Sequence, residues 1–142
     1  MAEAILRRQI EERGIKAEIL SRGLAAPVGR RPHRNAIEVC AARGMPISSS
    51  KHAALLTAFE VRIASRILVM EEAHQKLITK KYPAAEGKTF RMDHYAPTGD
   101  IADPVRSPKS VFLEMWDQMN AYCSDWADAL AAEQTFPERA IS

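Results

Sequence analysis

The sequence predicts an α/β fold with three layers, in which helices cover both faces of a short parallel sheet. Segments with the helical spacing of apolar residues alternate with short runs rich in β-branched and other apolar residues, and Gly or Pro marks most of the boundaries. Strands that alternate with helices favour parallel pairing, because each return to the same edge of a sheet needs a crossover. A chain of 142 residues, 46% hydrophobic and 27% charged, has the size and composition of one globular domain. We therefore expect a single domain over residues 1–142.

The elements expected in the first half are mostly helical. They are a helix over residues 2–13, an extended segment over residues 17–22, a loop over residues 26–34 and a helix over residues 35–44. The first helix has Ile5, Leu6 and Ile10 on one face, and Gly14 is placed to end it. Gly44 has the same position after the second helix.

The second half should contain two strands and three helices. We expect a helix over residues 54–64, a buried strand over 66–70, a short helix over 71–83, an edge strand over 88–95, a loop over 97–108 and a long helix over 109–133. The long helix carries an apolar stripe that includes Phe112, Trp116, Met119 and Cys123. Together with the extended segment over residues 17–22, these are three short candidate strands, which make a thin sheet, so we expect that one strand is missing from the predicted core.

Composition excludes several classes of protein. Cys40 and Cys123 form no CxxC pair, so neither a zinc site nor a disulfide framework is expected, and no cofactor or metal is predicted. No apolar run reaches the ~18 residues of a membrane span, and the first twenty or so residues are too charged for a signal peptide. We expect a cytoplasmic protein with no membrane partner. The first quarter of the chain is basic, with Arg30, Arg31 and Arg34 in one loop, but a solvated surface explains this charge better than an anionic partner.

Four stretches in order resemble the bacterial low-molecular-weight protein tyrosine phosphatases. They are MAEAILRR at the start, SRGL at residues 21–24, RILVMEEAH at residues 66–74 and IADPVRS at residues 101–107. The first resembles the helix after the family's phosphate-binding loop, and the last resembles the loop with its general acid. The resemblance implies a flavodoxin-like phosphatase fold and hydrolysis of phosphotyrosine through a phosphocysteine.

The resemblance also implies that this chain begins after the family's first strand and its C-x5-R-S loop. The helical pattern is already under way at Ala2, and no capping Ser, Thr, Asp or Asn precedes it. We therefore expect an N-terminally truncated domain without its first central strand, its nucleophile and its phosphate-binding arginine. Met1 is expected to be an internal start within a longer product.

Asp103, followed by Pro104, is the candidate catalytic residue. Asp-Pro is a common turn dipeptide, so the residue alone would be assigned to a turn. The family match instead implies a general acid that protonates the leaving phenolate and then acts as base for the attacking water. Neither Cys40 nor Cys123 is followed by an arginine at the required spacing, and both fall on apolar helical faces as core thiols. No nucleophile and no phosphate-binding residue is therefore assigned.

Three functions remain open from the sequence. The first is a tyrosine phosphatase whose longer form acts on a phosphotyrosine protein such as a tyrosine kinase, with this chain inactive as written. The second is a pseudophosphatase that serves as a binding or regulatory module, and a missing strand would then favour oligomers or strand exchange. The third is a mainly helical regulatory protein with a basic loop, although no nucleic-acid-binding motif is present and no nucleic-acid partner is expected.

Overall fold

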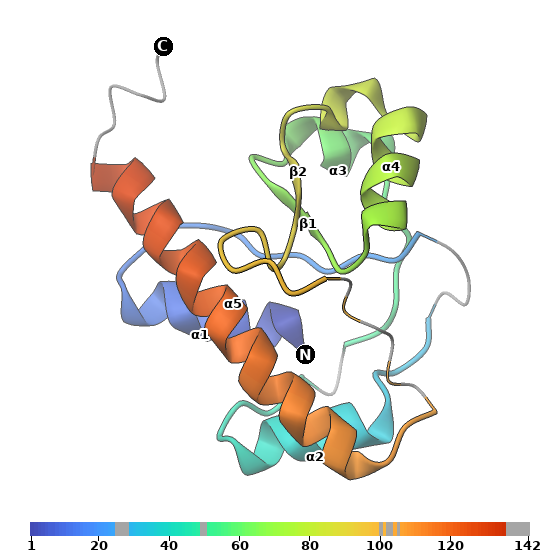
Figure 1. Ribbon diagram of the computed structural model, residues 1–142, viewed down its shortest axis with the longest axis vertical. Coiled ribbons are helices and arrows are strands. Elements are labelled where there is room, and N and C mark those ends of the chain that lie inside the picture. Colours follow the sequence, from blue (N-terminus) through green and yellow to red (C-terminus); the bar gives the residue numbers. More distant parts are fainter. Residues whose placement is uncertain (25–28, 49–50, 100, 102–103, 105, 136–142) are drawn as a thin grey trace. The chain divides into compact units, whose positions relative to one another are not determined.

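The computed structural model describes residues 1–24, 29–48, 51–99, 101, 104 and 106–135. Its elements, in chain order, are α1 (Ala2–Glu12), α2 (Arg34–Ala42), α3 (Ala58–Ile63), β1 (Ile67–Val69), α4 (Glu72–Lys81), the 3-10 helix η1 (Pro83–Ala85), β2 (Thr89–Arg91) and α5 (Lys109–Thr135) (Figure 1). The strands pair in parallel. The predicted α/β class with a short parallel sheet is confirmed. Within the described residues, no helix combines the length and the apolar character needed to cross a membrane.

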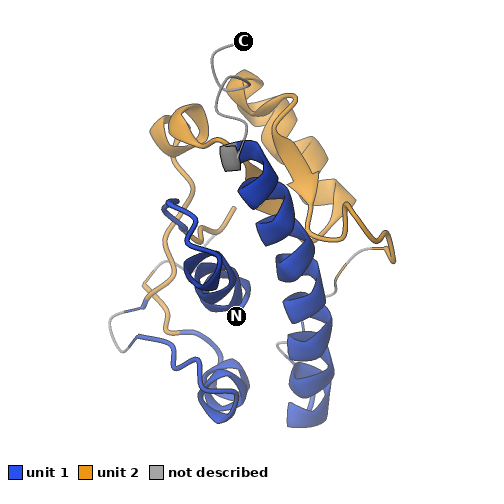
Figure 2. Cartoon of the chain, turned by 90° about the vertical axis from the view of Figure 1, so that its left-hand side faces the viewer, with its two compact units in different colours: residues 1–20, 32–51, 104–142 blue, residues 21–31, 52–103 orange. Residues whose placement is uncertain are grey.

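The chain divides into two compact units, which Figure 2 shows in different colours. Unit 1 comprises residues 1–20, 32–51 and 104–142 and contains α1, α2 and α5. Unit 2 comprises residues 21–31 and 52–103 and contains both strands with α3, α4 and η1. The single domain over residues 1–142 stays a prediction.

Unit 1 is built around the long helix α5, against which α1 and α2 pack. The predicted apolar stripe of α5 is confirmed, because Phe112, Trp116, Met119, Cys123 and Trp126 are all buried. On α1 the same holds for the predicted apolar face of Ile5, Leu6 and Ile10. Matching apolar faces on α1 and α5 thus explain why these elements fold as helices and pack together.

Glycines end the first two helices as the sequence predicts. Gly14 has φ of +65° and Gly44 has φ of +74°, in the left-handed region that residues with a Cβ rarely adopt. This turn lets the N–H of Ile15 reach the carbonyl of Ile10 at 2.9 Å, and that of Met45 reach Cys40 at 2.8 Å. The carbonyls of Ile10 and Cys40, near the C-terminal ends of α1 and α2, thereby gain hydrogen-bond donors.

Unit 2 is organised by the two-stranded sheet. β1 pairs with β2 in register, with Ile67 opposite Thr89 and Val69 opposite Arg91, and α4 lies in the connection between the strands. The core of the unit is a cluster of buried apolar side chains, namely Val61, Val69, Ile78 and Ala85. Each comes from a different element, so the cluster holds α3, β1, α4 and η1 together.

The helix predicted over residues 54–64 is shorter than expected. α3 begins at Ala58 because Thr57 caps it: the Thr57 hydroxyl accepts the Glu60 N–H, and the Glu60 carboxylate accepts the Thr57 N–H, both at 3.1 Å. Before the cap the chain is extended, and Leu56 donates its N–H to Gly23 at 2.9 Å. The prediction was wrong over residues 54–57 because the pattern of apolar residues continues through the cap.

The strand predictions were partly wrong. Residues 17–22 form no strand, and the nearest pairing is an isolated parallel bridge between Gly23 and Leu55. The predicted strand over 66–70 is confirmed as β1, but the one over 88–95 ends at Arg91. It ends there because the chain turns around Asp93, with the His94 N–H donated to Arg91 and the Ala96 N–H to Asp93, both at 3.0 Å.

Candidate active site

Asp103, the predicted general acid, lies outside the described residues. The nearest described residue before it is Ile101. Ile101 is buried, and its N–H donates to the carbonyl of Met70 at 2.9 Å, directly after β1. The segment that leads to Asp103 is therefore attached at the carboxyl end of a parallel strand, the edge at which α/β proteins place their ligands.

A buried carboxylate holds the same segment from the other strand. Asp93 is only 2% exposed, and it accepts two hydrogen bonds from Arg91: Nε reaches Oδ1 at 2.9 Å and Nη2 reaches Oδ2 at 2.7 Å. Oδ2 also accepts the backbone N–H groups of Thr98 at 2.8 Å and Gly99 at 2.9 Å. The residues just after β2 are thus tied to the loop that leads toward Ile101.

These partners keep Asp93 ionised. The Arg91 guanidinium and the two backbone N–H groups stabilise the carboxylate and lower the pKa of Asp93 to about 2, although burial of the group acts in the opposite direction. Asp93 is consequently an anion and cannot deliver a proton at neutral pH. Its role in this region is to hold the backbone.

A hollow of about 590 Å³ runs between α4 and β2 in unit 2. It is lined by Glu72, Gln75, Thr79, Gly87, Thr89, Phe90, Arg91, Asp93, His94 and Pro97. Two of its polar side chains form hydrogen bonds within the protein: Gln75 donates to the Thr89 carbonyl at 2.7 Å, and Thr79 donates to the Gln75 carbonyl at 2.9 Å. The hollow has no thiol among its lining residues.

The two thiols are core groups, as predicted. Cys40 in α2 and Cys123 in α5 are fully buried and free. Burial raises the pKa of Cys40, and it raises the pKa of Cys123 to about 12. The Cys123 thiol is 3.8 Å from the carbonyl oxygen of Ala2, to which it donates. Because the thiolate is the nucleophilic form, neither residue is suited to attack a phosphate.

The first turn of α1 is held by a network of ion pairs rather than by a capping side chain. Met1 is the N-cap residue and makes no side-chain cap hydrogen bond. Glu3, in the first turn, is 2.9 Å from the ammonium of Lys51 and 3.6 Å from the Arg7 guanidinium. A carboxylate near the N-terminus of a helix is favourable for the helix dipole.

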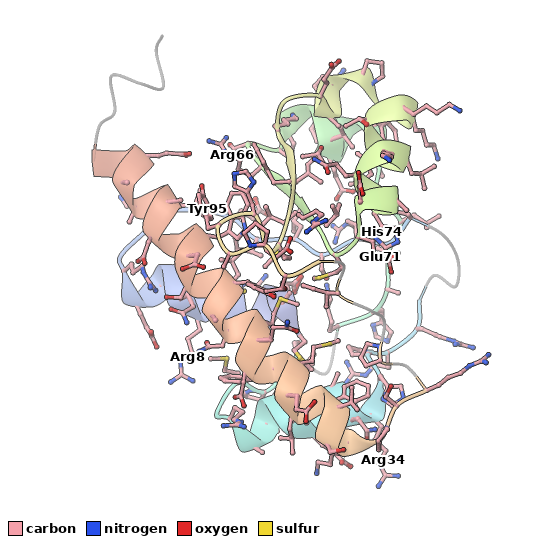
Figure 3. The ribbon with its side chains drawn as sticks, in the orientation of Figure 1. Arg8, Arg34, Arg66, Glu71, His74 and Tyr95 are labelled. Carbon is pink, nitrogen blue, oxygen red and sulfur yellow. The ribbon has the colours of Figure 1, made fainter. Side chains whose placement is uncertain are left out.

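The histidines have separate roles. His33 caps α2 by accepting the Asn35 N–H at Nδ1, and its ring stacks on Phe112 with 4.9 Å between centroids. His74 lies near Glu71 at the start of α4, with 3.8 Å between Nε2 and Oε2 (Figure 3). His94 packs against Phe90 and Tyr95. Within the described ranges, no three His, Cys, Asp or Glu side chains gather closely enough to hold a metal ion.

The Arg91–Asp93 pair was not predicted from the sequence. The spacing Arg-x-Asp does not by itself indicate a buried pair, and only the burial of Asp93 and its backbone partners distinguish this one. The sequence does contain one signal for an acceptor at this place, namely the Pro- and Gly-containing loop that follows, whose N–H groups need an acceptor.

The basic residue Arg34, from the predicted basic loop, forms an ion pair with Glu38 at 3.0 Å.

Parallel strands connected through α4 place this chain among the α/β proteins. A solved structure of the tyrosine phosphatase Wzb from Escherichia coli K30, in complex with sulphate, has this fold. It matches with a TM-score of 0.81 and 27% identity, and the match covers 91% of this chain and 87% of that one.

Sequence comparison defines the family. The model described as low molecular weight phosphotyrosine protein phosphatase matches residues 1–135, and the chain therefore belongs to this family. It is 33% identical over 132 residues to the probable low molecular weight protein-tyrosine-phosphatase EpsP of Ralstonia nicotianae, covering 93% of this chain and 87% of that protein. It is also 28% identical over 119 residues to a protein-arginine-phosphatase of Geobacillus stearothermophilus, covering 82% and 79%.

Proposed function

We propose that this protein serves the hydrolysis of phosphotyrosine on proteins, with Asp103 as general acid and then as general base. The observation that carries the proposal is the match to the phosphatase family over residues 1–135, within which Asp103-Pro104 stands where the resemblance implies the acid. The attachment of Ile101 beside the end of β1 supports it, because this edge of a parallel sheet is where reacting groups are placed. The proposed chemistry is protonation of the leaving phenolate.

We further propose that the 142-residue chain by itself does not turn over aryl phosphates. Attack on phosphorus needs a thiolate. Both cysteines are fully buried and have raised pKa values, and both facts oppose formation of the thiolate. The bidentate arginine that favours transition-state charge in this chemistry also has no counterpart after either cysteine.

The test compares two proteins with p-nitrophenyl phosphate. One is the 142-residue chain, and the other carries at its N-terminus a strand and a C-x5-R-S loop of the pattern that the family resemblance implies. We expect turnover only from the second protein, and Asp103→Asn in it should lower kcat by roughly 10²- to 10⁴-fold. The matched control is Asp100→Asn, which should leave kcat within about twofold. Turnover by the 142-residue chain that is lost on Asp103→Asn would contradict the proposal.

The second candidate is a pseudophosphatase that binds a partner without hydrolysis. The two buried, non-nucleophilic thiols favour it for this chain. The measurement is isothermal titration of the 142-residue chain with a phosphotyrosine peptide and with its unphosphorylated form. Binding that requires the phosphate and leaves it intact supports this function, whereas equal or absent binding argues against it.

Substrate class, partner and location complete the proposal. Phosphotyrosine is favoured because the relative with the highest identity reported above has that name, and a phosphoarginine peptide should be the poorer substrate of the extended protein. The proposed partner is a phosphotyrosine protein such as a tyrosine kinase.

We propose a cytoplasmic location, which suits two free thiols. Oligomers of the 142-residue chain also stay a prediction, and sedimentation would reveal them.

A further inference from the structure

The short helix α3 has apolar side chains on two sides. Val61 is 1% exposed and packs into the core of unit 2. Phe59 and Ile63 are each 59% exposed, and as residues four apart they lie on one outer face of the helix. An exposed Phe–Ile pair on a helix that is already anchored from its other side is unusual for a purely solvated surface and is typical of a contact surface.

Three cationic side chains lie on α3 or next to it. The Arg62 guanidinium lies 5.6 Å from the centre of the Phe59 ring, and none of the described carboxylates pairs with it. Lys88 donates through Nζ to the carbonyls of Arg62 at 3.2 Å and Ala64 at 2.7 Å, at the C-terminal end of α3. Arg66 follows the helix and is exposed (Figure 3).

The acidic residue of α3 does not offset this charge. The Glu60 carboxylate is 2.8 Å from Nε of Arg22, and it also closes the capping box with Thr57. These interactions lower the pKa of Glu60 and keep it ionised within its own pair, although its partial burial acts in the opposite direction. The outer face of α3, defined here by Phe59, Arg62 and Ile63, therefore presents apolar groups with a cation among them.

We propose that the outer face of α3 docks an acidic segment of a partner protein that carries apolar side chains. The apolar residues of the segment cover Phe59 and Ile63, and its carboxylates meet Arg62. Charge complementarity selects this occupant over a second copy of the chain, because two α3 faces brought together by a twofold axis would place cation against cation. The face is small, so the contact is weak and transient.

This docking function goes beyond hydrolysis and does not depend on it. α3 precedes β1, whereas the segment that leads to Asp103 follows β2 and is attached after the end of β1. In a parallel sheet these positions belong to opposite edges. A partner could thus be held at α3 whether or not the chain performs any chemistry.

The experiment measures binding of a defined probe to the full 142-residue chain. The probe is a fluorescein-labelled peptide, acetyl-EEDLFEELDE-amide, followed by fluorescence anisotropy. One comparison peptide replaces each Glu and Asp by Gln and Asn, and another replaces Leu and Phe by Ser. We expect a Kd of about 10–100 µM for the probe and at least about 10-fold weaker binding for each comparison peptide.

Variants locate the site. Phe59→Ser together with Ile63→Ser should weaken binding about 10-fold or more, and Arg62→Glu about fivefold. The matched control is Leu77→Ser, a residue 49% exposed on α4, which should leave the Kd unchanged. Thermal unfolding followed by circular dichroism checks that each variant folds, and all four side chains are exposed enough for that to be expected.

Three results would overturn the proposal. The first is a Kd that is the same for the wild type and for the Phe59→Ser, Ile63→Ser variant. The second is concentration-dependent dimerisation that these substitutions abolish, which would make a second copy the occupant. The third is binding of anionic phosphatidylglycerol vesicles, but not of the acidic peptide, through the same three residues, which would assign the face to a membrane surface.

Discussion

The two units treat their buried titratable groups in opposite ways. In unit 2 the Asp93 carboxylate is surrounded by the Arg91 guanidinium and two backbone N–H groups, and its pKa falls to about 2. In unit 1 the Cys123 thiol is fully buried, and burial raises its pKa to about 12. Both groups are nearly inaccessible to solvent. Burial opposes the charged form of both groups: at Asp93 the Arg91 guanidinium and the backbone N–H groups outweigh it, whereas at Cys123 burial prevails.

The largest expected effect is that of removing the buried carboxylate. Asp93→Ala removes the oxygens that accept hydrogen bonds from the Arg91 guanidinium and from the N–H groups of Thr98 and Gly99, and we expect a loss of about 3 kcal/mol in the free energy of unfolding. Urea denaturation followed by circular dichroism measures it. Asp117→Ala is the control, since that carboxylate is 62% exposed beside Arg43 and should cost below about 1 kcal/mol.

A double-mutant cycle with Arg91→Ala sharpens this comparison. If the guanidinium is the main partner of Asp93, the double variant should be less destabilised than the sum of the two single variants by more than about 1 kcal/mol. Additive losses would mean that the backbone N–H groups, and not the ion pair, account for the role of Asp93.

The next effect is a dependence of stability on pH. The folded-state pKa of Asp93 lies near 2, below its ordinary value, so the carboxylate contributes its stability in full above about pH 4 and loses it as pH falls toward 2. The expected size is about 2 kcal/mol. The measurement compares the urea midpoints of the wild type and of Asp93→Asn at about pH 7, 4 and 2.5. An identical acid dependence in Asp93→Asn would show that other carboxylates cause the loss.

The two buried thiols test the cost of placing a polar group where few hydrogen-bond partners are at hand. Cys40 is fully buried, and its thiol has no hydrogen-bond partner among the residues that the structure describes, so the hydroxyl of Cys40→Ser should cost about 2 kcal/mol. The Cys123→Ser hydroxyl has the Ala2 carbonyl nearby and should cost about 1 kcal/mol. Urea denaturation compares the two variants. Equal costs would mean that the Ala2 carbonyl does not satisfy the new hydroxyl.

The helices were the part of the fold that the sequence predicted well. The apolar stripes of α1 and α5 and the glycines at positions 14 and 44 carry strong local signals, and the structure agrees with them. The start of α3 and the absence of a strand over residues 17–22 were not predicted. These depend on the hydrogen-bond partners of the backbone: Thr57 caps the helix together with Glu60, and Gly23 forms an isolated bridge with Leu55.

The candidate site was predicted from family resemblance rather than from periodicity. Asp103 has no local feature that distinguishes it from a turn aspartate, and Asp93 was not identified at all. The clamp around Asp93 forms only when the loop returns and brings the N–H groups of Thr98 and Gly99 to its carboxylate. Contacts of this kind arise from the fold of the loop, so a pattern of residue types does not contain them.

The smallest expected effect is that of an exposed ion pair in the same unit as Asp93. Lys76 lies 3.4 Å from Glu72 one turn away on α4, and the two side chains are 76% and 58% exposed. We expect Lys76→Ala to change the free energy of unfolding by no more than about 0.5 kcal/mol, because water and salt screen the pair and Ala favours the helix. Urea denaturation with and without added salt measures it. A cost near that of Asp93→Ala would mean that proximity of opposite charges, rather than burial with full hydrogen bonding, makes the Arg91–Asp93 pair important.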